Sequence, residues 1–152
     1  MSFSGGPQLT FRPLEQRDVK AISGIHHCAC LVAYAFMNWR YPIDEVERWY
    51  AGKFAEWSWT LAALDADAMA GFIALKDHHI DQLYVDPSQQ RTGIGSALLG
   101  KALNAVSGRI TLDVFEENLG ARAFYEKHGF EARDRWMNTE KGAIDLLYVR
   151  EG

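Results

Sequence analysis

The sequence predicts an α/β domain in which about four helices flank a mixed sheet of six to seven strands. The chain has 152 residues, of which 48% are hydrophobic, and this is enough for one domain with a sizeable core. Helical and strand periodicities alternate along the chain, and no repeat, low-complexity tract or linker separates them. A central stretch, 79–106, combines one strand, one loop and one helix. We therefore expect a single domain over residues 1–152.

The N-terminal third is expected to hold one strand and two helices. Residues 1–7 are small and polar, without a basic start or an apolar run, so we expect a flexible N-terminus and no signal peptide. A strand follows over 8–12, and the apolar stripe of a long helix runs over about 17–36. Pro42 begins a second helix, because proline is favoured at the first helical position. The apolar stripe of that helix consists of Ile43, Val46, Tyr50 and Phe54.

The rest of the chain alternates between strands and two further helices. Segments 57–64 and 68–76 are expected to pair in antiparallel fashion, because the turn between them is short. A central strand over 79–85 ends at an Asp-Pro pair, and apolar residues at every fourth position then predict a helix over 94–106. Asn118 as N-cap and Gly129 as C-cap bracket another helix. The remaining strands are expected at 109–115, 130–137 and 143–149.

The loop between the central strand and its helix has the chemistry of a phosphate site. Gly93 and Gly95 remove the side chains that would hold a ligand away from the backbone. The first amides of a helix have no intrahelical partner, and the helix dipole adds partial positive charge there. Arg91 contributes a fixed charge and Ser96 a hydroxyl. These features suit a phosphate or pyrophosphate, and an ordinary glycine-containing turn before a core helix is the alternative.

Three known phosphate-binding patterns can be compared with this loop. A P-loop requires a lysine after its second glycine, and Gly95 is not followed by one. A dinucleotide fingerprint needs a third small residue at the position of Leu98. Asp113 mimics the ribose-binding acid of that fold, but the chain that follows it is too short to complete a doubly wound sheet. The third pattern, Gln/Arg-x-x-Gly-x-Gly/Ala, is matched by Gln90, Gly93 and Gly95. In this the loop resembles the acetyl-CoA signature of the GCN5-related N-acetyltransferase (GNAT) superfamily.

A second block makes the resemblance specific. The strand at 109–115 is followed by the pattern N-x-x-A-x-x-F-Y, from Asn118 to Tyr125, and then by Gly129-Phe130. This order, and its distance from the glycine loop, are similar to the second conserved block of the same family. The resemblance covers roughly residues 8–150 and is strongest over 79–131.

The resemblance implies both a fold and a reaction. It implies a mostly antiparallel sheet whose strands at 79–85 and 109–115 splay apart and admit acetyl-CoA, the co-substrate. Enzymes of this family transfer the acetyl group to an amine by direct attack in a ternary complex. The residues implied to bind acetyl-CoA are Leu83, Tyr84, Val85, Gln90, Arg91, Thr92, Gly93, Ile94, Gly95, Ser96, Asn118, Ala121, Phe124 and Tyr125.

Three residues are the catalytic candidates. Tyr125 stands where many family members keep the tyrosine that protonates the departing thiolate, and a packed aromatic is the alternative interpretation. Several relatives use a glutamate as base on the central strand, and this sequence has His79 at that position. Asp81, two residues on, is expected to share a strand face with His79 and to orient it or relay a proton through water. A surface histidine and a solvated aspartate at a strand start are the alternative.

Charge and cysteine content limit the partners. The net charge of −4 and a pI near 5.7 give no general attraction to nucleic acid or to an anionic membrane, and they tolerate a cationic acceptor. The longest apolar run, 28–37, is too short to span a bilayer. Cys28 and Cys30 are poor disulfide partners because they lie two residues apart, which favours a reduced, cytoplasmic protein.

A metal site is not expected. His26 and Cys30 would share a helix face, but no second pair of ligands stands near them in the sequence. The aromatic residues of the first two helices are expected mostly in the core, with a minority lining an acceptor pocket. They are Tyr34, Trp39, Tyr41, Trp49 and Tyr50.

Two functions are left open by the sequence. The first is an N-acetyltransferase that acts on a primary amine of a small molecule or peptide. The second is a non-catalytic acyl-CoA-binding sensor of the same fold. Tyr125 and Asn118 favour the enzyme. A homodimer is also left open, because members of this family often dimerise.

Overall fold

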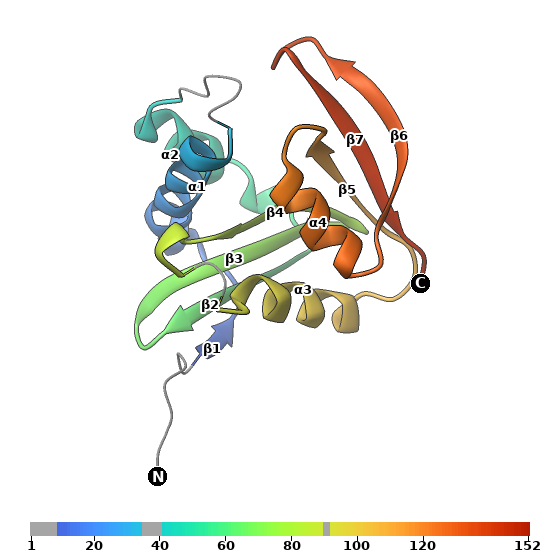
Figure 1. The fold of residues 1–152 in the computed structure, drawn as a ribbon. Helices are drawn as coiled ribbons and strands as arrows, with labels where there is room; N and C mark the ends of the chain where they lie inside the picture. The colour runs from blue at the N-terminus through green and yellow to red at the C-terminus, as the bar shows by residue number, and fades with distance from the viewer. Residues whose placement is uncertain (1–8, 35–40, 90–91) are drawn as a thin grey trace.

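In the computed structural model of the chain, the described residues are 9–34, 41–89 and 92–152, and they form one seven-stranded mixed sheet (Figure 1). The strand order is β1-β2-β3-β4-β5-β7-β6. The strands are β1 (Leu9–Arg12), β2 (Trp59–Asp65), β3 (Ala68–Lys76), β4 (His79–Val85), β5 (Ile110–Phe115), β6 (Glu131–Asn138) and β7 (Ala143–Arg150). All neighbouring strands are antiparallel except β4 and β5, which are parallel.

In the described ranges, four α-helices accompany the sheet, in agreement with the prediction of about four. They are α1 (Val19–Ala33), α2 (Ile43–Ala51), α3 (Ile94–Ala105) and α4 (Leu119–Lys127). Short 3-10 helices are η1 (Gln16–Asp18), η3 (Phe54–Glu56) and η4 (Pro87–Gln89). The predicted mixed, mostly antiparallel sheet with about four helices is therefore confirmed.

The differences from the expected boundaries are small. Helix α1 ends at Ala33, before the expected end at Phe36, and 35–36 lie outside the described residues. Helix α2 stops before Gly52, so Phe54, expected in its stripe, lies in η3 instead. The expected flexible N-terminus at 1–7 and the first residue of the expected strand at 8–12 also lie outside the described residues.

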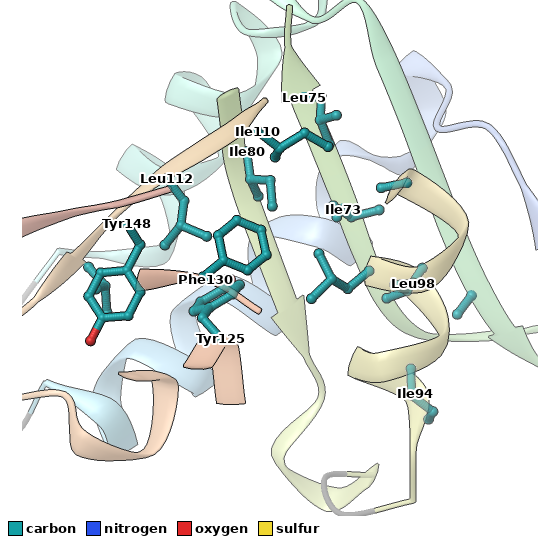
Figure 2. Packing of buried hydrophobic residues seen from close by; sticks show 14 of the residues in the cluster. Ile73, Leu75, Ile80, Ile94, Leu98, Ile110, Leu112, Tyr125, Phe130 and Tyr148 are labelled. Carbon is teal, nitrogen blue, oxygen red and sulfur yellow. The ribbon is translucent and has the colours of Figure 1, made fainter. Parts of the chain in front are cut away.

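Two apolar clusters lie on opposite faces of the sheet. The larger one joins α3 and α4 to the central strands and includes Ile73, Leu98 and Tyr125 (Figure 2). The smaller one joins α1 and α2 to β2 and β3 and includes Ile22 and Phe72. In Figure 1, α3 and α4 accordingly cover one face, while α1 and α2 lie against the other. The sheet is thus closed on both faces near β3 and β4.

Strands β4 and β5 separate almost as soon as they meet. They pair only between His79 and Thr111, with one further bond from the Thr111 amide to the His78 carbonyl at 2.9 Å. Because the two strands are parallel, the opening between them widens toward their carboxyl ends. The splay implied by the sequence resemblance is therefore confirmed.

A β-bulge lies in β4 beside this opening. Gln82 pairs with Ala74, and Ile80 pairs with Leu75, so Asp81 is an extra residue with no counterpart in β3. A bulge interrupts the strict alternation of side chains and bends the strand that contains it. The bulge thus lies close to the point where the pairing of β4 with β5 ends.

Within residues 9–34, 41–89 and 92–152, no helix is both long enough and apolar enough to cross a membrane.

Candidate active site

The glycine loop and the start of α3 form one side of the candidate site. Gly93 is the N-cap of α3 and has a left-handed backbone (φ 85°), which favours glycine at this position. Nothing lies within 4 Å of a Cβ built on Gly93, whereas a Cβ on Gly95 would lie 3.4 Å from the Phe124 ring. Thr92 Oγ1 donates to the Gln89 carbonyl at 2.5 Å and fixes the approach to the helix. Gln90 and Arg91, expected to bind the cofactor, lie outside the described residues.

Ser96 and Ile94 were expected to bind a phosphate through this loop. The Ser96 hydroxyl lies 3.0 Å from His128 Nε2, so the first turn of α3 is joined to the end of α4. Burial lowers the pKa of His128, and the charges of Lys127 and Arg150 lower it further. The Ile94 side chain is buried in the larger cluster, which leaves its main chain as the part that can face a ligand.

The β4 side of the opening holds three further expected cofactor residues. Leu83 and Val85 pack against the larger cluster, and their pairs in β3 are Ile73 and Gly71. Tyr84 turns to the other face, where its hydroxyl lies 3.7 Å from Cys30 Sγ. The other edge of β4 forms no ladder with β5 beyond His79, so main-chain groups there can pair with another extended chain.

Helix α4 borders the opening from the β5 side. Asn118 is its N-cap, as predicted, and its side chain accepts a hydrogen bond from the Ala121 amide at 3.2 Å. Ala121 and Phe124 pack against the larger cluster. Phe124 lies between Gly95 and His128, with 4.9 Å between its ring centroid and that of His128. The structure therefore brings the residues expected from the two sequence blocks, 92–96 and 118–125, next to one another.

Tyr125 is buried among aromatic rings. Its ring centroid lies 5.1 Å from that of Phe124 and 5.6 Å from that of Phe130. Figure 2 shows the Tyr125 ring beside that of Phe130. Burial raises the pKa of Tyr125, and the nearby Tyr34 raises it further. The phenol therefore stays protonated at neutral pH, and this is the form that can donate a proton.

Tyr34 is a site residue that sequence reasoning did not single out. It follows the last residue of α1 and hydrogen-bonds with Tyr84 of β4 and with Asn118. Its ring lies edge-on to Phe115 of β5, with 5.2 Å between the centroids, and burial raises its pKa to about 12. One side chain thus spans the opening between the two strands. The sequence placed Tyr34 only within an aromatic-rich region, and no periodicity marks which ring of that region reaches the sheet.

His79 and Asp81 have different partners. His79 Nδ1 lies 2.7 Å from Thr111 Oγ1, and its Nε2 lies 3.8 Å from Asp113 Oδ2. Asp81 instead accepts a hydrogen bond from Trp57 Nε1 at 2.8 Å, and its carboxylate lies 3.3 Å from Lys53 Nζ. Asp81 lies on the same face of the sheet as His79, because its partner Trp57 packs with the smaller cluster, and the bulge adds Gln82 to that face. Thr111 and Asp113, rather than Asp81, contact His79.

His26 and Cys30 do not gather further metal ligands. His26 Nδ1 lies 2.5 Å from the Tyr50 hydroxyl, and burial lowers the pKa of His26 to about 4. Tyr50 also donates to Gln82 Oε1 of β4 at 3.2 Å. In the part of the chain that the structure describes, no three histidine, cysteine or acidic side chains are grouped as a metal ion would require.

The chain is similar in sequence to a known family and to individual proteins of that family. Residues 28–130 match the model of the acetyltransferase (GNAT) family. The chain is 30% identical over 116 residues to the peptidyl-lysine N-acetyltransferase YjaB of Escherichia coli, and this match covers 74% of the chain and 76% of that protein. It is 35% identical over 92 residues to the peptidyl-lysine N-acetyltransferase YjaB of Salmonella typhimurium. This match covers 58% of the chain and 63% of that protein, which is less than two thirds of that protein's length.

Solved structures share the fold. Apo YjaB from Escherichia coli has a TM-score of 0.78 at 24% identity, over 95% of this chain and 98% of that one. The PaiA N-acetyltransferase of Thermoplasma acidophilum, solved in complex with coenzyme A, has a TM-score of 0.76 at 20% identity, over 95% and 99% of the two chains. The architecture in Figure 1 therefore extends over nearly the whole length of these proteins.

Proposed function

The chain belongs to the acetyltransferase (GNAT) family, and from this we propose that it transfers the acetyl group of acetyl-CoA to a primary amine by direct attack in a ternary complex. The observation that carries the proposal is the opening between β4 and β5, which begins directly after His79 and Thr111. The glycine-capped start of α3 and the start of α4 border it. An extended thioester arm and a pyrophosphate have complementary surroundings there.

The chain's own residues fit such a co-substrate. Gly93 keeps the approach to the α3 amides open, because no described atom beyond its two chain neighbours lies within 4 Å of the place where a Cβ would stand. Gly95 allows Phe124 to close over the same turn. The unpaired edge of β4 at 83–85 presents main-chain donors to the negative charge that develops on the thioester oxygen. Acetyl-CoA supplies the activated acetyl group when bound.

The proposed role of Tyr125 is that of a general acid. The amine first loses a proton, because an ammonium has no lone pair and a lysine-like amine titrates near pH 10.4. Its nitrogen then bonds to the acetyl carbon, and the carbon–sulfur bond breaks with its electron pair on sulfur. Tyr125 gives the sulfur a proton, and the second proton lost by the nitrogen restores the tyrosine through solvent. The buried, protonated phenol supports this role.

A lysine side chain of a peptide is the acceptor that we favour among primary amines. Both YjaB proteins bear the name peptidyl-lysine N-acetyltransferase. The net charge of −4 and the exposed acids of the first turn of α2, Asp44 and Glu45, are compatible with a cationic acceptor.

Release of free thiol from acetyl-CoA tests the proposal. The purified chain is assayed with lysine-containing peptides, free lysine, polyamines and aminoglycosides, and each is compared with a reaction without amine. We expect amine-dependent release of thiol, fastest with the peptides. Binding of acetyl-CoA without release of thiol for any amine would instead identify a sensor of the same fold.

A further inference from the structure

Strands β5, β7 and β6 share a sheet face that lies outside the smaller apolar cluster. That cluster joins α1 and α2 to β2, β3 and β4, and among the described residues it includes none from β5, β6 or β7. On β5, Leu112 and Val114 turn to the larger cluster, so Asp113 and Phe115 lie on the opposite face. Figure 1 shows these three strands beyond β4, at one edge of the sheet. The face therefore begins at β5, which borders the opening between β4 and β5.

Three side chains form one row across this face. Asp145 of β7 pairs with Phe115 of β5 on one side and with Trp136 of β6 on the other. Residues directly opposite in antiparallel strands place their side chains on the same face, with Cβ atoms about 4.5–5.5 Å apart. A carboxylate is therefore flanked by an aromatic ring on each neighbouring strand. Tyr34 adds a third ring, because it lies edge-on to Phe115 with 5.2 Å between the centroids.

In the described part of the chain, the Asp145 carboxylate has a neutral partner and no cationic one. Asp145 is only 8% exposed, and its Oδ2 accepts a hydrogen bond from the Asn138 side chain at 2.8 Å. Among the ion pairs of residues 9–34, 41–89 and 92–152, none includes Asp145. Buried acids are normally paired with a cation, because an isolated charge is costly to remove from water. The row therefore leaves a place for a cation that comes from a ligand.

The aromatic neighbours make this place suitable for a cation. The face of an aromatic ring attracts a cation that lies within about 6 Å of its centroid, and tryptophan does so most strongly. Trp136 is 39% exposed and lies on β6, the edge strand of the sheet, so a ligand reaches its ring from solvent. A guanidinium suits the row best, since it stacks on aromatic faces and also pairs with a carboxylate.

Asp145 lies close enough to the opening to act on a molecule that reacts there. Burial raises the pKa of Asp113, the His79 charge lowers it, and the Asp145 charge raises it. Asp145 is one strand beyond β5, and neighbouring strands lie about 4.8 Å apart. An amine between β4 and β5 and a cation at Asp145 are thus separated by roughly 7–10 Å. An extended peptide places side chains two residues apart on one side, at a distance of about 6.8 Å.

Resting on the proposed acetyl transfer, we propose that Phe115, Asp145 and Trp136 form a second cation site, which binds a basic side chain of the acceptor two residues from the lysine that is acetylated. The acceptor class is therefore a dibasic segment, and arginine is the preferred second residue. A polyamine also carries two cations on one extended chain, and it is the other source of this chemistry.

Binding of a product peptide tests the site without any turnover. The peptide carries acetyl-lysine and, two residues on, arginine. Its matched control carries citrulline, which has the shape of arginine without its charge. The indole N–H signal of Trp136, assigned by its loss in Trp136→Phe, is followed by NMR as each peptide is added in the presence of CoA. We expect the arginine peptide to shift this signal and to bind at least tenfold more tightly. Equal affinities for the two peptides, or an unshifted Trp136 signal, would overturn the proposal.

Two variants measure the contribution of the charge and of the ring to catalysis. Asp145→Asn and Trp136→Leu should each lower kcat/KM for the unacetylated arginine peptide at least tenfold, chiefly through KM. The citrulline peptide and the affinity for CoA should be unaffected. Asp134→Asn is the matched control, because it removes an exposed acid from β6 on the same face. Unchanged selectivity for arginine in both Asp145→Asn and Trp136→Leu would refute the site.

Spermidine distinguishes the two sources of the second cation. It is compared with a monoamine of the same length in the parent chain and in Asp145→Asn. We expect the arginine peptide to be the better substrate. A higher kcat/KM for spermidine that depends on Asp145 would support the site and identify a polyamine as its ligand.

Thermal unfolding separates a binding role of Asp145 from a structural one. A carboxylate kept for a ligand leaves an uncompensated buried charge in the free protein, so Asp145→Asn should leave Tm unchanged or raise it. A lower Tm together with unchanged selectivity for arginine would assign Asp145 a structural role and refute the inference. Trp136→Leu changes an exposed side chain, so it decides the matter even where Asp145→Asn is unstable.

The outcomes separate the two proposals. A parent chain that acetylates no amine would refute the proposed function, and the binding of the product peptides would still decide the second cation site. A parent chain that acetylates the arginine and citrulline peptides equally well would refute the present inference alone.

Discussion

Among the single residues, Tyr125 has the most specific proposed role, because its hydroxyl is expected to protonate the departing thiolate. Tyr125→Phe keeps the ring against Phe124 and Phe130 and removes only the proton donor. We expect kcat to fall roughly a hundredfold, because general acid catalysis typically contributes at least this factor, while the affinity for CoA changes little. Steady-state kinetics and a CoA titration measure the two quantities.

Tyr148→Phe is the matched control for that variant. The Tyr148 hydroxyl donates to Glu126 at 2.6 Å and accepts from Arg122 Nε at 3.0 Å, so its loss removes structural hydrogen bonds in the same part of the fold. We expect lower stability and little change in kcat. Equal kcat losses in both variants would assign Tyr125 a packing role.

Sequence reasoning identified some residues at this scale and missed others. Tyr125 and Asn118 were found because a pattern of fixed spacing marks them. Thr111 and Asp113 were not assigned to the active site, since their contact with His79 depends on the parallel pairing of two strands far apart in the sequence. The bulge at Asp81 was not foreseen either, because nothing in a run of strand residues marks an extra one.

The start of α3 is the element whose backbone matters most for the cofactor. Gly93→Val places a branched side chain at φ 85°, in the open approach to the helix amides. We expect the affinity for CoA to fall at least tenfold, with a loss of stability of about 1–2 kcal/mol from the left-handed backbone. Isothermal titration with CoA and thermal unfolding measure these effects.

Gly108→Val is the control for backbone strain. Gly108 has a similar backbone (φ 92°) with nothing within 4 Å of a Cβ, and it lies beyond the other end of α3. We expect a comparable loss of stability with no loss of CoA affinity. A similar loss of affinity in both variants would show that the glycine loop acts only as a turn.

Strand β1 is joined to the start of α1 by a charged pair. Arg12 donates to both carboxylate oxygens of Asp18 at 2.8 Å, and the Asp18 side chain is only 7% exposed. The hydrogen bonds from Arg12 lower the pKa of Asp18 against the opposing effect of burial. The Asp18 carboxylate therefore binds a proton more weakly in the folded state than in the unfolded state. The stabilisation is complete above the ordinary aspartate pKa of about 3.9 and is lost as the pH falls through the lower folded-state value.

Asp18→Asn tests this contribution. We expect it to lower the free energy of unfolding by roughly 1–3 kcal/mol at pH 7 and to weaken the fall in stability below about pH 4. Asp44→Asn is the control, because Asp44 and Arg48 form an exposed pair at 3.5 Å. Urea unfolding from pH 2 to 7 measures both variants, and equal pH profiles would contradict the assignment.

At the scale of the whole molecule, the architecture was accessible from the sequence. The strands and helices alternate with clear periodicity, and caps such as Asn118 mark where helices begin. The strand order is not a local property and was not predicted, and the separation of β4 from β5 was foreseen only through the family resemblance. The reach of Tyr34 across the opening follows from the packing of α1 on the sheet, which no local pattern encodes.

Binding of the co-substrate should stabilise the whole fold. Acetyl-CoA at about a hundred times its Kd should raise the free energy of unfolding by about 2.7 kcal/mol, provided that it binds only the folded state. NADH and ATP at the same concentrations should have much smaller effects. Thermal unfolding measures the three ligands side by side, and a shift with NADH but none with acetyl-CoA would refute the assignment of the site.

The central claim is that the acetyl group passes directly from acetyl-CoA to the amine. Its most direct test is a single-turnover experiment with acetyl-CoA that carries a carbon-13 label in the acetyl group. The labelled compound is mixed with an excess of the chain and a lysine-containing peptide, and mass spectrometry follows the label in time. We expect the label to appear on the lysine amine of the peptide in step with the release of CoA, without transient labelling of the protein. Label that first accumulates on the protein, or acetate formed while the peptide stays unmodified, would contradict this account.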